Sequence, residues 1–347
     1  MPRRLAECRR EWNSEENKDV VILHMFPRNA LSPSLSPYAL KLETFLRMHD
    51  VKYKVEHNVP IHPGTKKCPW ITLNGEDVAD SQQIIEYLTE KLSLVPKYDL
   101  ERNHKDKIFA RGLRSILEDH FNFCVMSKRM IHGKYEDVAP FFPTIVNVKM
   151  VQNFIAQRIM KDIGSQAKAQ GIGRLPKETV LKMANEDLEI VSLALGEKNF
   201  IMGDEPSELD CAIFAFLVLN LGDFLNKPKK EVDEEAKTGN EEDKEAKEEE
   251  KGANDAKKTE TIETEVEEKY ENLQAYIPRI KERFWSDWDD LCKEAEEAMA
   301  KKEKGKRSED KEVEGTENAK ENEDATDAAK SENDTTENNG EKKDKEK

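Results

Sequence analysis

The spacing of apolar positions differs between the first part of the chain and the rest. Residues 19–26 form a short β-branched run that ends at a proline, which predicts a buried strand. Helical spacing in residues 38–50 predicts a helix, and residues 51–59 alternate as a strand does. Residues 68–80 contain two strand-like runs around an Asn-Gly turn, and residues 81–94 form an amphipathic helix. The predicted order is βαβ followed by ββα.

After Asp99 every long apolar pattern has the 3.6-residue period of a helix. Residues 207–225 are apolar on nearly all faces, so this helix is expected to run through the centre of the helical part. Residues 267–299 form an aromatic-rich helix pair that needs a core to pack against. Strands and helices followed by helices alone predict an α+β fold, with a mixed first domain and an all-helical second domain.

Two charged stretches, residues 226–262 and 299–347, contain almost no large apolar side chains. They cannot bury enough surface to offset their chain entropy, so we predict a disordered acidic insertion and a disordered charged tail. The insertion costs little, because the entropy of loop closure grows only logarithmically with length. The polar residues 1–18 are predicted to form a flexible N-terminus. The remaining residues give a first domain at 19–97 and a helical domain at 98–225 and 263–298.

The net charge of the chain limits the kinds of molecule that it is expected to bind. A formal net charge of −16 argues against nucleic acid, because phosphate recognition requires clustered Lys and Arg. The acidic stretches are interpreted as solvated spacers, with basic protein partners as the alternative. No apolar run approaches the ~20 residues that span a bilayer, and the N-terminus lacks a secretory signal pattern. We expect a cytoplasmic protein without a transmembrane segment.

The cysteines and histidines do not predict a metal site. The five cysteines are widely spaced and form no CxxC pair, which is typical of a reducing compartment. His57, His62 and Cys68 do not stand at ligand spacing on one element. We therefore expect no metal.

Ser36 and Pro37 stand at the start of the helix predicted at 38–50. Ser36 is expected at the N-cap with Pro37 at N1, which directs a hydroxyl and unpaired N–H groups at whatever lies in front of the helix. A thiolate would be favoured there, and a hydroxyl donating to it would lower its pKa. Ser32, Ser34 and Tyr38 compete for this role, and Ser36 as a simple cap is the alternative.

Two further pairs surround the predicted strands at 68–80. Pro69 is expected to be a cis-proline that exposes the backbone of Cys68 to an extended peptide. Cys68 has no nearby second cysteine, so an inert thiol is favoured over a catalytic one. Asp80 and Ser81 open the next helix, where Ser81 is expected as the N-cap. The helix dipole could hold a carboxylate there while Asp80 accepts an ammonium, and an ordinary cap is the equally weighted alternative.

A capping box is predicted at Ser207 and Asp210, with a role in folding. Together with other parts of the chain, this box resembles the failed-axon-connections family. The segments that carry the resemblance are 20–28, 34–48, 68–88, 200–217 and 270–288. Members of that family look like glutathione transferases and metaxins in fold. The resemblance covers roughly residues 20–225 and 264–290. It implies a thioredoxin-like N-terminal domain and a helical glutathione-transferase C-terminal domain.

The resemblance also implies a site and a role. It assigns glutathione binding to Ser36, Cys68 through its backbone, Pro69, Asp80 and Ser81, with Ser36 as the candidate catalytic residue. Two departures weigh against turnover, because Ser36 lies in a crowded PSLSP turn and Cys68 replaces the small β-branched residue usual before the proline.

The implied function is a cytoplasmic, axonal binding or scaffolding module in axon development, with unidentified protein partners and with or without retained glutathione binding. The alternatives are an active glutathione transferase and a metaxin-like mitochondrial import component. Relatives of this fold commonly pair through their N-terminal domains, so a homodimer is the candidate assembly.

Overall fold

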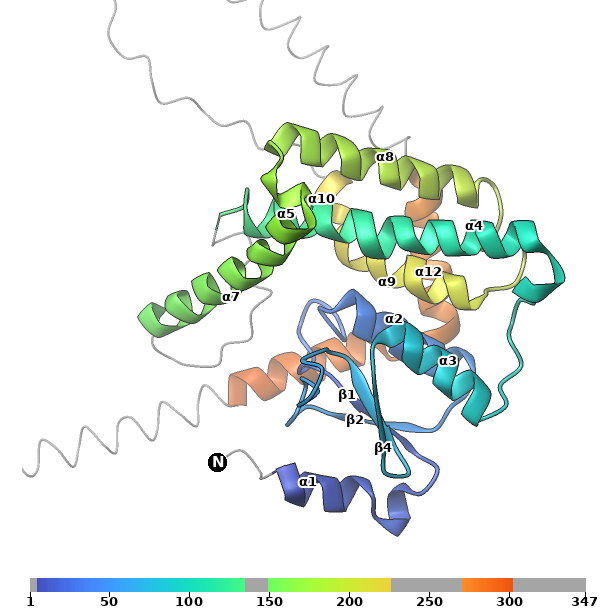
Figure 1. Ribbon diagram of the computed structural model, residues 1–347, viewed down its shortest axis with the longest axis vertical. Helices are drawn as coiled ribbons and strands as arrows, with labels where there is room; N and C mark the ends of the chain where they lie inside the picture. The colour runs from blue at the N-terminus through green and yellow to red at the C-terminus, as the bar shows by residue number, and fades with distance from the viewer. Residues whose placement is uncertain (1–4, 135–148, 226–269, 302–347) are drawn as a thin grey trace, which may run out of the picture.

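A four-stranded mixed sheet forms the centre of the N-terminal domain (Figure 1). The computed structural model describes residues 5–134, 149–225 and 270–301. The strand order is β2-β1-β3-β4, with β1 and β2 parallel and the other neighbours antiparallel. The strands are β1 Val21–His24, β2 Tyr53–Glu56, β3 Trp70–Leu73 and β4 Glu76–Ala79. The predicted βαβ and ββα order is confirmed, including the turn at Asn74 and Gly75, which both have positive φ.

The sheet register brings three chain segments to one edge. His24 pairs with Trp70, and Trp70 pairs with Ala79. The end of β1, the beginning of β3 and the end of β4 therefore lie together. The chain leaves β1 towards α2, Pro37–Met48, and leaves β4 directly into α3, Ser81–Lys91. This edge carries the predicted site residues.

One face of the sheet is covered by α2 and α3 (Figure 1). The two helices and the strands share one apolar core, in which Leu42, Phe45 and Leu88 are fully buried against Leu23 and Ile71. Each such side chain stabilises the fold by about 1.5–3 kcal/mol through the apolar area it removes from water. The periodic apolar face of residues 38–50 is thus explained by contact with the sheet.

The other face is covered by the N-terminal segment, which the sequence analysis treated as flexible. Residues 5–17 form α1, Leu5–Trp12, and a short turn η1, Glu15–Asn17. Trp12 is 3% exposed, and its ring lies 4.3 Å from the ring of His24 and 5.7 Å from that of Trp70. Arg9 binds Asp77 at 2.6 Å. The prediction of a flexible N-terminus was therefore wrong for these residues. The few apolar side chains on one face of α1 are enough to pack this short helix against the sheet.

The second domain is entirely helical within the described residues (Figure 1). Residues 209–217 of its central helix are all buried, as expected of a helix that is apolar on nearly all faces. The elements are η2 Leu100–Arg102, α4 His104–Ser115, η3 Ile116–Phe121, α5 Asn122–Met130, α7 Lys149–Gln170, η5 Ile172–Arg174, α8 Lys177–Leu195, α9 Glu208–Asn220, α10 Gly222–Leu225 and α12 Glu271–Phe284.

The predicted aromatic helix pair is confirmed as α12 followed by a helix at 288–301. Tyr276 and Trp285 pack into the core of the helical domain. The last helix continues to residue 301, beyond the predicted boundary at 298. The predicted insertion at 226–262 and the rest of the predicted tail lie outside the described residues. No helix in the part of the chain that the structure describes is long and apolar enough to cross a membrane.

The two domains are joined by specific contacts between α2 and the helical domain. The ring of Tyr38 lies 5.5 Å from that of Phe216 on α9, in an edge-on arrangement. The indole nitrogen of Trp285 donates to Thr44 Oγ1 at 3.1 Å, and Arg47 binds Asp287 at 2.6 Å. These bonds fix the N-terminal domain against the helices that follow it.

Candidate functional site

The sequence-predicted residues gather at the sheet edge described above. Ser36 precedes α2, Cys68 and Pro69 precede β3, and Asp80 and Ser81 follow β4. Lys67, next to Cys68, bonds to Asp80, which joins the second segment to the third.

Ser36 is the N-cap of α2, as predicted, and Pro37 occupies N1. Its backbone is extended (φ −92°, ψ 116°), and its Oγ accepts a hydrogen bond from the Ala39 N–H at 3.4 Å. Among the described residues, none accepts the hydroxyl hydrogen of Ser36. Its O–H is therefore available to donate to a ligand in front of the helix.

The three competing hydroxyls are already engaged. Ser32 donates to the Ser34 carbonyl at 2.9 Å, and Ser34 donates to the Ser36 carbonyl at 3.4 Å; both serines are buried. Tyr38 donates to the Glu118 carbonyl at 3.1 Å. Burial, then the nearby Glu118 charge, raises the pKa of Tyr38 above its usual value. Of these four hydroxyls, only that of Ser36 has a hydrogen without an acceptor among the described residues.

The Cys68–Pro69 peptide bond is cis, as expected of this position. Within the described ranges, no hydrogen bond engages the Cys68 backbone N–H or C=O, so both are open to an extended partner. Burial raises the pKa of the Cys68 thiol to about 11, although a hydrogen bond from the Phe26 backbone lowers it in part. The thiol thus keeps its proton at neutral pH, which favours the inert interpretation over the catalytic one.

Asp80, and not Ser81, is the N-cap of α3. Its carboxylate accepts from the Gln82 N–H at 3.1 Å and the Gln83 N–H at 3.4 Å, with φ at 90°. The sequence prediction was wrong because a carboxylate reaches two helix N–H groups at once, which leaves Ser81 as the first helical residue. Ser81 is 5% exposed, and its hydroxyl has no partner in the part of the chain that the structure describes.

Asp80 is also paired with a cation. Lys67 Nζ lies 2.5 Å from Asp80 Oδ2. Burial acts to raise the pKa of Asp80, but the hydrogen bond and charge of Lys67, with the two helix N–H groups, outweigh it and lower the pKa. Asp80 is therefore ionised at neutral pH, and an incoming ammonium group would compete with Lys67 for it.

A buried lysine lies beside the site and was missed in the sequence. Lys41 is 1% exposed, and its Nζ lies 2.6 Å from Glu118 Oε1 on η3 and 3.0 Å from Gln82 Oε1 on α3. Burial lowers the pKa of Lys41, and Glu118 opposes this. Nothing in the pattern distinguishes this lysine from a solvated one, because its burial comes from the second domain. It ties the N-termini of α2 and α3 to the helical domain.

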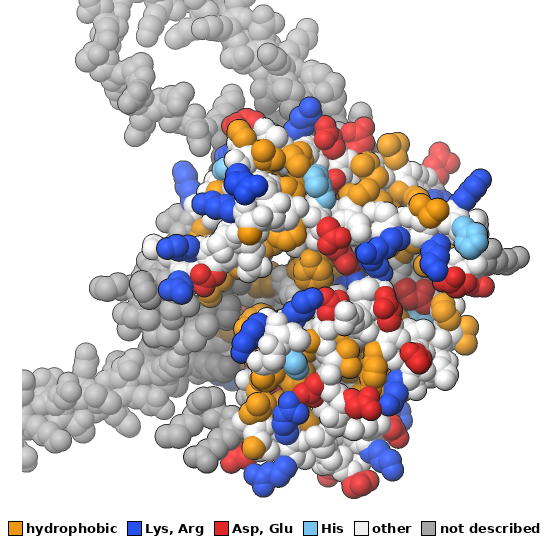
Figure 2. Space-filling model, in the orientation of Figure 1, with side chains coloured by type: hydrophobic (Ala, Val, Ile, Leu, Met, Phe, Trp, Pro, Cys, Tyr) orange, Lys and Arg blue, Asp and Glu red, His pale blue; other side chains and the backbone are white. Residues whose placement is uncertain are grey.

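Exposed apolar side chains border the site. Phe26 follows β1, Leu31 lies in the segment before α2, and Ile61 lies before the cis-proline; they are 45%, 56% and 43% exposed. On the face shown in Figure 2, acidic and basic side chains are interspersed over both domains. The site therefore offers a free hydroxyl, a free peptide edge and a helix N-terminus next to apolar surface, a combination suited to an extended, anionic small molecule.

Two family models match parts of the chain. The model of the glutathione S-transferase N-terminal domain matches residues 37–135, and that of the C-terminal domain matches residues 184–237. Failed axon connections of Drosophila melanogaster is 28% identical over 331 residues, which cover 87% of this chain and 69% of that protein. The chain has the glutathione S-transferase fold and is similar in sequence to Failed axon connections.

Two further proteins are similar to this chain, one in sequence and one in structure. Isoprene-epoxide–glutathione S-transferase of Rhodococcus sp. (strain AD45) is 24% identical over 192 residues, covering 53% of this chain and 80% of that enzyme. The crystal structure of the beta-etherase LigF from Sphingobium sp. strain SYK-6 aligns with a TM-score of 0.45 at 15% identity, covering 80% of this chain and 99% of that one.

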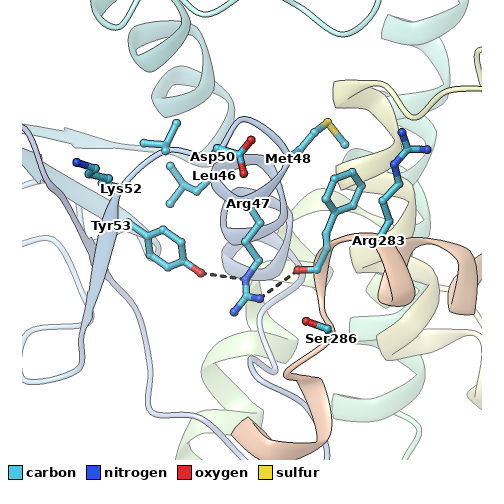
Figure 3. Close-up of a pocket in the computed structure, with 10 residues that line it drawn as sticks. Leu46, Arg47, Met48, Asp50, Lys52, Tyr53, Arg283 and Ser286 are labelled. Carbon is cyan, nitrogen blue, oxygen red and sulfur yellow. Dashed lines mark hydrogen bonds between the residues drawn. The ribbon is translucent and has the colours of Figure 1, made fainter.

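A pocket of about 600 Å³ lies away from the candidate site (Figure 3). Leu46, Arg47 and Met48 line it, so it sits at the C-terminal end of α2, roughly 18 Å from the N-terminal end that carries Ser36. Arg47 is held there by Tyr53 at 2.9 Å and by the Phe284 carbonyl at 3.1 Å (Figure 3). The pocket is a cleft between the domains, and both of its arginines are already paired, Arg47 with Asp287 and Arg283 with Glu205.

The structure brings together one more cluster that the sequence analysis missed. His120, Cys124 and Asp187 converge between η3, α5 and α8. The spacing of His120 and Cys124, four residues apart on one helical run, was a visible signal. Asp187 is remote in sequence and could be found only from the packing of α8.

Proposed function

We propose that this chain binds glutathione at the sheet edge formed by Ser36, Cys68 and Ser81, and acts as a binding module in axon development. The observation that carries the proposal is the open backbone of Cys68 next to the cis-proline, flanked by two hydroxyls, those of Ser36 and Ser81, whose hydrogens have no acceptor among the described residues. Polar groups that are buried for purely structural reasons are normally hydrogen-bonded. Groups left available at one edge are typical of a ligand site.

Each part of glutathione matches one of these groups. Its extended peptide can pair with the N–H and C=O of Cys68 as an added strand does. A carboxylate is favoured at the α3 N-terminus, where Ser81 can donate to it. Its ammonium can meet the ionised Asp80, and its sulfur can accept from the Ser36 hydroxyl. Pro69 keeps the peptide edge accessible.

Calorimetric titration of glutathione into the full chain tests the proposal. We expect saturable binding that Ser81→Ala weakens by about 3- to 10-fold, the range for one lost hydrogen bond to a charged group. Ser165→Ala is the matched control, because Ser165 is exposed on α7 and donates only to Asp162. The absence of binding at millimolar glutathione, or equal weakening by both variants, would overturn the proposal.

Conjugation of glutathione to small electrophiles is the second candidate, and the free Ser36 O–H favours it. A hydroxyl that donates to the sulfur would stabilise the thiolate, and Phe26 and Leu31 offer apolar surface to an electrophile. Ser36→Ala is then expected to lower kcat/KM by roughly 100-fold, whereas Tyr38→Phe is not. Equal rates in the wild type and Ser36→Ala would leave binding as the sole function.

The role in axon development rests on the relationship to Failed axon connections. We infer a cytoplasmic protein that acts through protein partners, with glutathione as a bound cofactor. Expression of the chain in flies that lack Failed axon connections tests this, with the wild type and Ser81→Ala compared side by side. Restored axons with the wild type alone would link the role to the ligand site. Failure of the well-expressed wild-type chain would count against a shared role.

A further inference from the structure

His120, Cys124 and Asp187 form a compact cluster in the helical domain. One ligand atom from each residue lies within 4.8 Å of the other two. His120 is near the end of η3, Cys124 follows on α5, and Asp187 comes from the facing helix α8. The cluster therefore joins two helical segments that are distant in sequence.

The local helix geometry explains why the first two side chains face the third. Residues four apart on a helix share one face, and His120 and Cys124 have this spacing. The η3 segment is a π-helix, a form that is rare and frequently marks functional positions. Asp187 belongs to the buried face of α8, which packs against α5 and η3. All three side chains are thus directed into one narrow space.

Burial in the cluster is graded from inside to outside. Cys124 is completely buried, the side chain of Asp187 is 7% exposed, and that of His120 is 38% exposed. His120 Nδ1 lies 2.6 Å from Asp187 Oδ2. Burial, then the charge of Asp187, raises the pKa of the Cys124 thiol to about 12. The cluster holds a buried carboxylate and a protonated thiol behind an imidazole that solvent can reach.

We propose that these three residues bind a divalent cation of the zinc type. A thiolate, an imidazole nitrogen and a carboxylate oxygen are the donors that zinc uses in proteins. With bonds of about 2.0–2.3 Å, tetrahedral ligands stand about 3.5 Å apart, so the 2.6 Å contact must widen by about 0.9 Å, and any pair near the 4.8 Å limit of the cluster must close by about 1.3 Å. Water takes the fourth position, on the exposed side next to His120.

Binding exchanges a proton for the metal ion without a redox change. The S–H bond of Cys124 breaks, its proton passes to solvent, and a sulfur–zinc bond forms. The hydrogen between His120 Nδ1 and Asp187 Oδ2 moves as well: the neutral imidazole shifts to the tautomer that carries its proton on Nε2, so that Nδ1 and the carboxylate oxygen can both bond to the ion.

The position of the cluster gives the ion a role in domain contact. Two residues before His120, Glu118 holds Lys41 through its side chain and Tyr38 through its carbonyl. An ion that fixes the end of η3 would therefore fix the surface against which the N-terminal domain rests. We expect zinc to raise the melting temperature of the full chain.

Titration of cobalt(II) into the full-length, reduced protein is the direct test. Cobalt bound by a thiolate in tetrahedral geometry shows a sulfur-to-cobalt charge-transfer band and visible ligand-field bands. We expect one equivalent to saturate both, and zinc to displace it. Cys124→Ser should abolish the charge-transfer band, and His120→Gln should weaken binding at least about 10-fold. His120 is partly exposed, so that variant is expected to fold, which circular dichroism checks.

Cys292→Ser is the matched control, because Cys292 is another buried free thiol, in the helix at 288–301. Its spectrum should equal that of the wild type. The proposal is overturned if the wild type shows no charge-transfer band, if the band survives in Cys124→Ser, or if folded His120→Gln binds as tightly as the wild type. In those cases the His120–Asp187 pair only joins η3 to α8.

Discussion

The starts of helices α9 and α3 both carry an aspartate and a serine, but these residues have different roles in the two places. At the start of α9, the carboxylate of Asp210 is fully buried and accepts from the Ile201 N–H, the Ser207 N–H and hydroxyl, and the Tyr276 hydroxyl, at 2.7–3.0 Å. At the start of α3, Asp80 is partly exposed, and the Ser81 hydroxyl has no partner among the described residues.

The two helix starts differ in whether all of their hydrogen-bonding groups are paired. Every oxygen of the α9 box is occupied, so the motif can only hold the fold together. The α3 pair leaves a donor unused at a helix N-terminus, where an anion is favoured. An acid and a serine at a helix start therefore predict a ligand site only where their hydrogen-bonding capacity remains open.

Asp210→Ala should produce the greatest loss of stability. It leaves the N–H of Ile201 and the groups of Ser207 and Tyr276 buried without an acceptor. We expect the free energy of unfolding in urea to fall by about 4 kcal/mol. A loss below about 1 kcal/mol would mean that water replaces the carboxylate and that the box is not closed.

Tyr276→Phe should have an intermediate effect. The change removes one hydroxyl that donates to Asp210 Oδ1 at 2.9 Å, within the core. Denaturant titration should show a loss of about 1.5 kcal/mol. Tyr87→Phe is the control, since the hydroxyl of Tyr87 donates to the exposed Glu76. Similar losses in the two variants would contradict the assignment of Tyr276 to the buried box.

Asp80→Asn should change stability in a pH-dependent manner. The pKa of Asp80 is lowered in the folded state, so its ionised form stabilises the fold above its unfolded pKa of 3.8. The advantage of the wild type should be constant near neutral pH and should shrink as pH falls through the lower, folded value. In a Lys67→Ala background the advantage should be smaller at every pH. A gap that widens in acid would reverse the sign and refute the pairing.

Ser81→Ala should leave stability within about 0.5 kcal/mol of the wild type, because no protein group depends on its hydroxyl among the described residues. Thermal unfolding without ligand measures this, and the same variant should lose ligand affinity. A stability loss above about 1 kcal/mol would show that Ser81 acts as a structural residue like Ser207.

The sequence predicted those parts of the fold whose signals are local. The periodic core of α2, the Asn74-Gly75 turn and the uniformly apolar α9 were all recognisable, because each pattern reports its own burial. The cap at Ser36 was likewise local, since a serine before a proline is a strong helix start.

One error of prediction was local: Asp80 rather than Ser81 caps α3, because its carboxylate reaches two helix N–H groups from a backbone with positive φ. The other features that the sequence did not predict depend on partners that are remote in the chain. Lys41 is buried only because η3 of the second domain covers it. Asp187 joins His120 only through the packing of α8. Such residues become functional candidates after the domains are assembled, and no local pattern marks them.

The helix α1 acts as a cover for one side of the sheet, and this bears on the life of the protein in a cell. Removal of the residues up to Trp12 would uncover Ile22 and the indole of Trp70, which are otherwise 3% and 0% exposed. It would also bring water to the buried Nδ1 of His24, which has no partner among the described residues. A single proteolytic cut just after α1 would thus expose an apolar surface that chaperones retain and that aggregates readily.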